Sequence, residues 1–268
     1  MTDARDAVVA AQDAHHAEGH DYDKGSPHLR HDNLRGMVER RLGALVRERI
    51  AATGACRVLE VGGGHGTFTR CLLDAGAQVT VTEVSRASAA ALEASFGDRI
   101  EVRYDATGEE ILASEDRWDL AVMTAVLHHI PDYLAFLDRL AGLIAPGGAI
   151  FTVADPMWYP RMPKLVHGAQ RASYFSWRLL QGSYVRGLKT RWRRLRGVYV
   201  ETEESDVVEY HVWRQGCDEE AIRDLLATRF GTVEVFPYWA TQAPLLQRLG
   251  DKTSMVCDFG VQATGRRP

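Results

Sequence analysis

Three glycines at alternate positions, Gly62, Gly64 and Gly66, follow an apolar run at 57–61 and precede a stretch of helical spacing that opens at Thr67. A glycine turn between a strand and a helix leaves backbone N–H groups and a helix N-terminus able to bind a small polar ligand. The dinucleotide fingerprint G-x-G-x-x-G would require glycine at position 67. The spacing therefore predicts a small-ligand site and argues against a dinucleotide.

Acidic and imidazole side chains follow the neighbouring apolar runs. Glu83 lies 21 residues after Gly62, a separation at which an acid in a doubly wound sheet reaches ribose hydroxyls. Asp105 follows the next run, and His128 with His129 follows the one after that. An imidazole titrates near neutral pH and suits a general base, although both histidines can equally be structural groups near a helix start. The pattern predicts a ribose-binding acid near a candidate base.

A parallel sheet would hold these residues at one edge. Between Arg57 and Asp155, short β-rich runs alternate with stretches whose apolar residues recur at helical spacing and which end in Gly or Pro-Gly. We expect strands over residues 57–61, 78–84, 99–104, 118–123 and 148–155. Right-handed crossovers between such strands give a doubly wound α/β sheet that binds ligands at its carboxyl edge.

Two later apolar runs complete the predicted sheet. The runs 232–239 and 254–263 are separated by a short piece without a full crossover helix, so an antiparallel pair at one sheet edge is the simplest arrangement. A helix that begins after Asp218 precedes them. The predicted fold class is α/β: a doubly wound, mostly parallel seven-stranded sheet with an antiparallel edge strand, an N-terminal helical segment and a helical lid inserted after strand five.

The chain divides into four predicted segments. They are an N-terminal helical segment, a ligand-binding core, a lid or substrate insert, and a C-terminal helix with edge strands, over residues 1–54, 55–155, 156–215 and 216–268, respectively. An amphipathic helix is expected over 28–53. The insert carries an aromatic run at 172–185 and a basic run at 186–196. An insert at the carboxyl edge of such a sheet is where a substrate lid would grow.

Five landmarks occur in order along the predicted core. They are the E-x-G-x-G-x-G form at 60–66, the acids Glu83 and Asp105, the stretch LHHIPD at 127–132 and the turn LIAPGG at 143–148. This series resembles the motifs of the class I S-adenosylmethionine-dependent methyltransferases of small-molecule type. The resemblance implies S-adenosylmethionine as cofactor, with Glu83 on its ribose hydroxyls and Asp105 on its adenine amino group. The implied cofactor contacts are Glu60, Gly62, Gly64, His65, Gly66, Glu83, Val84, Asp105, Ala106, Thr124 and Tyr22.

The resemblance also implies a reaction. Methyl transfer from a sulfonium is an in-line displacement, so alignment of the acceptor with the methyl group in a dry cavity supplies much of the rate. A phenol, hydroxyl or ammonium acceptor must also lose a proton, for which His129, and next His128, is the candidate base. Weaker candidates are Tyr22, His28 and His211. The aromatic run favours an apolar or aromatic small molecule of specialised metabolism, in natural product biosynthesis, with O-methylation as the expected reaction.

Two alternative functions stay open. The basic run 186–196 could bind RNA, an anionic membrane surface or an acidic substrate, which would suit a macromolecule (RNA or protein) methyltransferase. The plainer interpretation is a solvated helix whose cations pair with the acids at 201–206. The second alternative is a cofactor-binding, non-methylating enzyme such as a cyclase, because a fold does not determine a reaction.

Charge and missing motifs narrow the choice of acceptor. A net charge of −4 gives no overall reason to expect a nucleic-acid partner. No Pro-Cys pair for cytosine methylation is present, and no Pro-Pro-aromatic motif of amino-methylating DNA enzymes follows the fourth strand. Asp155-Pro156 stands where metal-dependent relatives have Asp-Asn, so we expect no bound metal.

The cysteines and the chain start bear on the compartment. The four cysteines show no C-x-x-C spacing, so neither a zinc site nor a disulfide framework is predicted. The first residues do not form a secretory signal, and no apolar run reaches the roughly 18 residues of a membrane span. We therefore expect a cytoplasmic protein without a membrane span that acts on a small-molecule substrate. The sequence indicates no oligomeric state.

Overall fold

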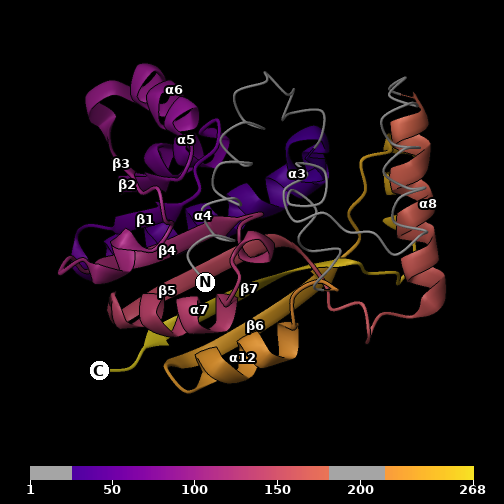
Figure 1. Cartoon of the computed structure of the whole chain (residues 1–268). Coiled ribbons are helices and arrows are strands. Elements are labelled where there is room, and N and C mark those ends of the chain that lie inside the picture. Colours follow the sequence, from indigo (N-terminus) through magenta and orange to yellow (C-terminus); the bar gives the residue numbers. More distant parts are fainter. Residues whose placement is uncertain (1–25, 181–214) are drawn as a thin grey trace.

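One seven-stranded sheet organises the described part of the chain (Figure 1). The computed structural model describes residues 26–180 and 215–268, with the backbone alone for 174–180. The strand order is β3-β2-β1-β4-β5-β7-β6. The strands are β1 (Arg57–Val61), β2 (Gln78–Glu83), β3 (Ile100–Tyr104), β4 (Trp118–Thr124), β5 (Ile144–Pro156), β6 (Phe230–Tyr238) and β7 (Asp258–Arg266).

The first five strands are parallel. β1 pairs with β2 and β4, β2 pairs with β3, and β4 pairs with β5. β1 and β4 contribute side chains to a buried cluster on each face of the sheet, which accounts for their nearly continuous apolar sequences. The carboxyl ends of the parallel strands meet at one edge, so Glu83 and Thr124 lie on the side of the sheet that the sequence predicts for the ligand.

β7 is antiparallel to both of its neighbours, β5 and β6. The connection from β6 to β7 contains only the short helix α13 (Pro244–Gly250), whose seven residues do not span the length of a nine-residue strand, as a crossover helix between parallel strands would. The predicted antiparallel pair at one edge of a seven-stranded sheet is confirmed. β6 is the outermost strand, and β7 lies one place further in.

Helices form a layer on each face of the sheet (Figure 1). One cluster of buried side chains joins α4, α5 and α6 to the sheet, and a second joins α7 and α12 to the opposite face. The helices are α3 (Pro27–Arg30), α4 (Asp32–Thr53), α5 (Thr67–Asp74), α6 (Arg86–Phe96), α7 (Tyr133–Gly142), α8 (Lys164–Leu180), α12 (Glu219–Ala227) and α13. Short 3₁₀ turns are η1 (Gly97–Arg99), η2 (Glu110–Ala113) and η3 (Leu127–His129).

The amphipathic helix expected over 28–53 is divided in the structure, because His31 is extended and separates α3 from α4. α4 forms most of the expected helix. Its apolar stripe is buried at helical spacing and consists of Leu34, Val38, Leu42, Leu45 and Val46. Arg49 continues this stripe but makes a polar contact, because its Nε and one terminal nitrogen donate to Asp119 Oδ1 at 2.8 Å and 2.6 Å. Gly54, with φ of +86°, ends the helix in the left-handed conformation that favours glycine.

α8 follows β5, at the place where the sequence predicts an insert. Residues 181–214, which include the basic run 186–196 and His211, lie outside the described residues. The side chains of the aromatic run from Tyr174 onward are likewise not described. Within the described ranges, no helix is both long and apolar enough to cross a membrane.

Candidate active site

The glycine loop between β1 and α5 adopts the left-handed backbone that its composition predicts. Gly62, Gly64 and Gly66 have φ angles of +74°, +54° and +79°, which residues with a Cβ rarely adopt. The Gly62 N–H donates to the Thr82 carbonyl at 2.8 Å, and the Gly64 N–H donates to the Glu83 carboxylate at 3.1 Å. These two bonds fasten the loop to the end of β2, at the carboxyl edge of the sheet.

The three glycines differ in their surroundings. A Cβ added at Gly66 would lie 2.3 Å from the Phe96 ring, and one at Gly62 would lie 2.8 Å from the Val126 side chain. A Cβ added at Gly64 would have no described atom within 4 Å apart from its own chain neighbours. Close packing therefore requires glycine at positions 62 and 66, whereas Gly64 borders space in which a ligand can lie.

Glu83, at the end of β2, is held by three backbone N–H groups. Oε2 accepts from Gly64 at 3.1 Å, and Oε1 accepts from Val84 at 2.9 Å and from Ser85 at 3.2 Å. Burial raises the pKa of Glu83, while these hydrogen bonds and the nearby His65 lower it. The carboxylate is thus fixed beside the glycine loop, where the sequence predicts a ribose-binding acid.

Asp105, after β3, closes its own turn. Oδ1 accepts from the backbone N–H and the hydroxyl of Thr107 at 3.1 Å and 2.9 Å, and Oδ2 accepts from the Ile111 N–H at 3.1 Å. A carboxylate offers about four acceptor positions, so these bonds orient Asp105 and leave room for one donor from a ligand. Ala106 lies in the same turn.

Glu60, within β1, is engaged with α5. Its Oε2 accepts a hydrogen bond of 2.6 Å from the Thr69 hydroxyl. The residue is 3% exposed, and burial raises the pKa of its carboxyl to about 7. Glu60 therefore joins β1 to the helix after the glycine loop, so its place in the site is to support that loop.

The histidine pair lies in η3, directly after β4. The backbone N–H of His128 donates to Asp155 Oδ1 at 3.1 Å, and His128 Nδ1 lies 2.8 Å from the same oxygen. The imidazole centroids of His128 and His129 are 4.0 Å apart. Asp155 is fully buried, and its Oδ2 accepts from the Thr152 hydroxyl at 2.9 Å. The Asp155 carboxylate thus sets the orientation of the His128 ring.

The His128–Asp155 pair is suited to proton exchange. Burial raises the pKa of Asp155 to about 7, although hydrogen bonds from Thr152 and His128 and the nearby His129 lower it. A carboxyl that titrates near neutral pH and is hydrogen-bonded to an imidazole can take part in acid–base chemistry. Nδ1 is the ring nitrogen that contacts Asp155, so Nε2 is the nitrogen that points away from this carboxyl.

The pairing of Asp155 with His128 does not follow from the sequence argument, in which Asp155 counts only as part of an absent metal motif. Ala154 has a φ of +69°, and the register of β5 shifts between Val153 and Asp155. This kink in β5 is not visible in the residue pattern. The available signal is that β4 and β5 are neighbours, so an acid after one and a histidine after the other share an edge.

Thr124, at the end of β4, has a buried hydroxyl that lacks a hydrogen-bond partner within the described part of the chain. Buried polar groups are nearly always paired, so this hydroxyl, like the buried Trp118 Nε1, needs a partner that the described residues do not supply. His65 is exposed in the glycine loop, and Tyr22 lies outside the described residues. Among the described residues, no group of three or more His, Cys, Asp or Glu side chains is arranged to hold a metal ion.

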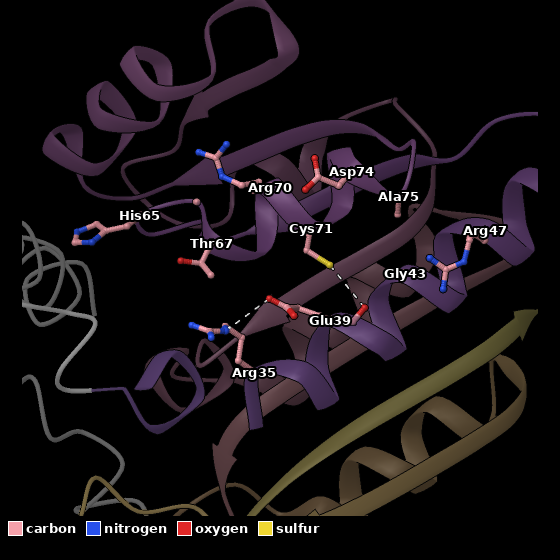
Figure 2. Close-up of a pocket in the computed structure, with 11 residues that line it drawn as sticks. Arg35, Glu39, Gly43, Arg47, His65, Thr67, Arg70, Cys71, Asp74 and Ala75 are labelled. Carbon is pink, nitrogen blue, oxygen red and sulfur yellow. Dashed lines mark hydrogen bonds and ion pairs between the residues drawn. The ribbon is translucent and has the colours of Figure 1, made fainter. Parts of the chain in front are cut away.

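A cavity of about 740 Å³ borders the glycine loop from the α4 side. Figure 2 shows Arg35 and Glu39 of α4 on one side of it and Thr67 and Cys71 of α5 on the other. Neither Glu83, Asp105 nor the histidine pair lines it, because it is framed by Arg35, Glu39, Gly43, Arg47, His65, Gly66, Thr67, Arg70, Cys71, Asp74 and Ala75. The cavity is thus adjacent to the strand-end site and separate from its acids.

The chain matches a known protein family. A family described as "Methyltransferase domain" matches residues 27–195, more than half of the chain. The chain belongs to the class I S-adenosylmethionine-dependent methyltransferases. The expectations of a methyltransferase and of S-adenosylmethionine as its cofactor are thereby confirmed at the level of the family.

Curated relatives match part of this methyltransferase. A ubiquinone biosynthesis O-methyltransferase from Xanthomonas campestris pv. campestris is 36% identical over 113 residues, which are 40% of this chain and 45% of the relative. A protein of the same name from Leptothrix cholodnii is 27% identical over 110 residues, which are 40% of this chain and 47% of the relative. The chain thus spans about half the length of the curated relatives it matches.

A solved structure matches nearly the whole chain. The plantazolicin methyltransferase BpumL, in complex with S-adenosylhomocysteine, aligns with a TM-score of 0.52 at 12% identity and covers 98% of this chain and 95% of its own. At this identity the match concerns the fold alone.

Proposed function

We propose that this methyltransferase transfers a methyl group from S-adenosylmethionine to a hydroxyl oxygen of an apolar or aromatic small molecule of specialised metabolism. The observation that carries the proposal is the His128–Asp155 pair, which lies at the same sheet edge as Glu83 and the open side of Gly64. Relatives named O-methyltransferases support oxygen as the acceptor atom.

The strand-end residues fit S-adenosylmethionine. Glu83, with three of about four acceptor positions filled by backbone N–H groups, would accept one hydrogen bond from a ribose hydroxyl, and Asp105 would accept one from the adenine amino group. The open side of Gly64 would admit the ligand against the loop, and the Thr124 hydroxyl would gain a partner. When bound, the cofactor supplies an electrophilic methyl group on a sulfonium.

We assign the role of general base to His128. The sequence analysis favours His129 for this role. In O-methylation the acceptor O–H proton would pass to His128 Nε2 as the new C–O bond forms. Asp155, bound at Nδ1, would stabilise the resulting imidazolium and keep the ring in one tautomer. The pair would thus couple deprotonation of the acceptor to methyl transfer.

In this proposal the four segments of the chain have two roles, one toward the acceptor and one toward the cofactor. Residues 1–54 and 156–215 would cover the acceptor, while 55–155 and 216–268 would form the cofactor-binding sheet. All four cysteines, Cys56, Cys71, Cys217 and Cys257, are free thiols, which supports a reducing compartment such as the cytoplasm. No described residue provides a specific observation in favour of RNA methylation or cyclisation.

Calorimetric binding of S-adenosylmethionine, S-adenosylhomocysteine and NAD to the purified protein tests the cofactor. We expect both sulfur nucleosides to bind and NAD not to bind, because the glycine spacing departs from the dinucleotide fingerprint. A panel of phenols and alcohols, with S-adenosylhomocysteine release as readout, then tests the reaction. Folded protein that binds neither sulfur nucleoside would contradict the cofactor, and binding without release across the panel would contradict O-methylation.

The variants His128→Ala and His129→Ala test the base. We expect His128→Ala to lower kcat about 100-fold or more with cofactor affinity within about twofold, because only the proton transfer is lost. His129→Ala should retain most of the rate. The opposite ranking of the two kcat values would return the assignment to His129.

A further inference from the structure

The phenol of Tyr238, at the carboxyl end of β6, joins two segments that are far apart in the sequence. The backbone N–H of Ala154 donates to the phenol oxygen at 3.0 Å, and His28 Nε2 of α3 lies 2.6 Å from the same oxygen. The rings of His28 and Tyr238 also meet edge to face, with centroids 5.4 Å apart. One oxygen atom thus links α3, β5 and β6.

The direction of the proton in this link can be assigned. Burial, together with the nearby His31, lowers the pKa of His28 to about 3, so the imidazole is neutral. Burial raises the pKa of Tyr238 well above its ordinary value, so the phenol keeps its proton. The buried phenol proton needs an acceptor, and His28 Nε2 is the acceptor within reach, so we assign the phenol as donor to Nε2 and place the proton of the His28 ring on Nδ1.

Ala154 is the point at which this link reaches the candidate catalytic pair. Its φ of +69° is left-handed, which an alanine adopts only when its surroundings impose it. The register of β5 shifts at the same position, so the strand ladder with β7 is interrupted there. Tyr238 supplies the acceptor for the Ala154 N–H, and the next residue is Asp155, which binds His128.

We propose that Tyr238 is a positioning residue for the His128–Asp155 pair, and that His28 makes this positioning depend on the docking of α3 against β6. The phenol holds the kinked backbone of Ala154, and the kink directs the Asp155 carboxylate to His128 Nδ1. The inference rests on the proposed function, because the role that it assigns to Tyr238 is carried out through His128 as the general base.

Other titratable groups act on the same region and are left unchanged in the test. His129 from η3 lowers the pKa of Asp155, while Cys257 and Asp258, at the start of β7, raise that of Tyr238. Burial raises the pKa of Asp258 to about 8, with a further contribution from Asp155.

The test compares Tyr238→Phe with the matched variant Tyr133→Phe. Both remove a phenol oxygen that accepts from a backbone N–H, in the control that of Asp218 at 2.9 Å. The readout is the tautomer of His128, measured by ¹⁵N NMR of imidazole-labelled protein saturated with S-adenosylhomocysteine. We expect the Nδ1–H tautomer to lose its predominance in Tyr238→Phe alone, because Asp155 no longer holds that nitrogen. An unchanged tautomer in folded Tyr238→Phe would overturn the proposal.

Variants of His28 test the second half of the inference. His28→Gln keeps an acceptor for the phenol proton and should preserve the tautomer, whereas His28→Leu removes the acceptor and should reproduce the effect of Tyr238→Phe. Should Tyr238→Phe not fold, His28→Leu gives the same readout. Equal tautomers in His28→Gln and His28→Leu would overturn the dependence on α3.

A kinetic measurement adds a second readout where the acceptor panel yields a substrate. Tyr238→Phe should lower kcat about tenfold with the KM for S-adenosylmethionine within about twofold, and Tyr133→Phe should change neither. A loss of thermal stability with kcat unchanged would reduce the phenol to a structural contact. If the wild-type protein transfers no methyl group, the proposed function fails, while the NMR comparison still decides whether Tyr238 positions His128.

Discussion

A side chain added at Gly64 would enter open space, whereas one added at Gly66 would collide with packed neighbours. Substitutions at these two glycines therefore separate effects on ligand binding from effects on packing. We expect Gly64→Ala to lower the affinity for S-adenosylhomocysteine at least tenfold, because the added methyl group enters the ligand space. The left-handed φ of +54° should also cost about 1 kcal/mol of stability. Calorimetry and urea denaturation measure the two effects separately.

Gly66→Ala is the matched variant. Its Cβ would collide with the Phe96 ring, so it should lower the free energy of unfolding by about 1–3 kcal/mol more than Gly64→Ala does. Unchanged ligand affinity in folded Gly64→Ala would show that the cofactor does not approach the loop at this position.

Glu60 links the stability of the protein to pH. The folded state raises the pKa of its carboxyl from 4.5 to about 7, so the folded state holds this proton more tightly than the unfolded state. The contribution of Glu60 to stability therefore falls as the pH rises from about 4.5 to about 7, by an amount of the order of 3 kcal/mol. Glu60→Gln, which can still accept from Thr69, should flatten this dependence.

Urea denaturation at pH 5 and pH 8 measures the effect of Glu60. The wild type should lose more stability than Glu60→Gln between these two values. Parallel losses in both proteins would mean that the carboxyl ionises in the folded state at an ordinary pH. Asp155 and Asp258 titrate in the same range and stay in place in both proteins, so only the difference is interpreted.

The sequence predicts the site residues unevenly. Glu83 and the glycines are predictable because their spacing is local and their roles need only a strand end and a turn. The Asp155–His128 contact is not, because it depends on which strands are neighbours and on a left-handed alanine. The ligand roles of Glu83 and Asp105 are still predictions.

The helix α4 is anchored at its C-terminal end by an ion pair that is mostly buried. The side chains of Arg49 and Asp119 are 18% and 16% exposed, and Asp119 also accepts from the Arg57 backbone N–H at 2.8 Å. Arg49→Met would leave the carboxylate with one of its partners. We expect a loss of about 2 kcal/mol in the free energy of unfolding, measured by urea denaturation.

Arg41→Met is the control for this element. Arg41 makes two hydrogen bonds to Glu234 and lies over the Phe236 ring, but the paired side chains are 28% and 49% exposed, so the loss should be about 1 kcal/mol. Ligand affinity should be the same in both variants. A larger loss for Arg41→Met than for Arg49→Met would contradict the anchoring role of Asp119.

Helices and strands are predicted from the sequence better than the neighbouring elements that each of them contacts. The parallel strands and the stripe of α4 follow from apolar periodicity, which is a local property. The interior place of β7 does not follow from periodicity, because its pairing with β5 joins segments that lie far apart in the sequence. Arg49 shows the same limit, since its partner Asp119 lies on another element.

On the scale of the molecule, the first described helices dock on the last strands. His31 Nε2 donates to the Thr241 carbonyl at 2.7 Å, Arg41 pairs with Glu234, and His28 meets Tyr238. Contacts between the two ends of the described chain thus complete the site edge, so removal of either end should disturb the sheet edge next to the His128–Asp155 pair.

The net charge of −4 makes a prediction about nucleic-acid binding. We expect the protein to bind RNA weakly, without the steep loss of affinity between about 50 and 200 mM salt that several phosphate contacts produce. Fluorescence anisotropy with labelled RNA at these two salt concentrations measures it. A steep salt dependence, with an affinity in the nanomolar range at low salt, would support the macromolecule methyltransferase instead.

β7 is the last strand along the chain, yet it lies between β5 and β6 in the sheet. During synthesis on the ribosome, β5 would expose an unpaired edge until residues 258–266 have been made. A nascent chain stopped before this point would contain the glycine loop and the histidine pair but not the complete sheet. Productive folding is therefore expected only after translation of β7, which would make chaperone binding to the unfinished chain important for yield.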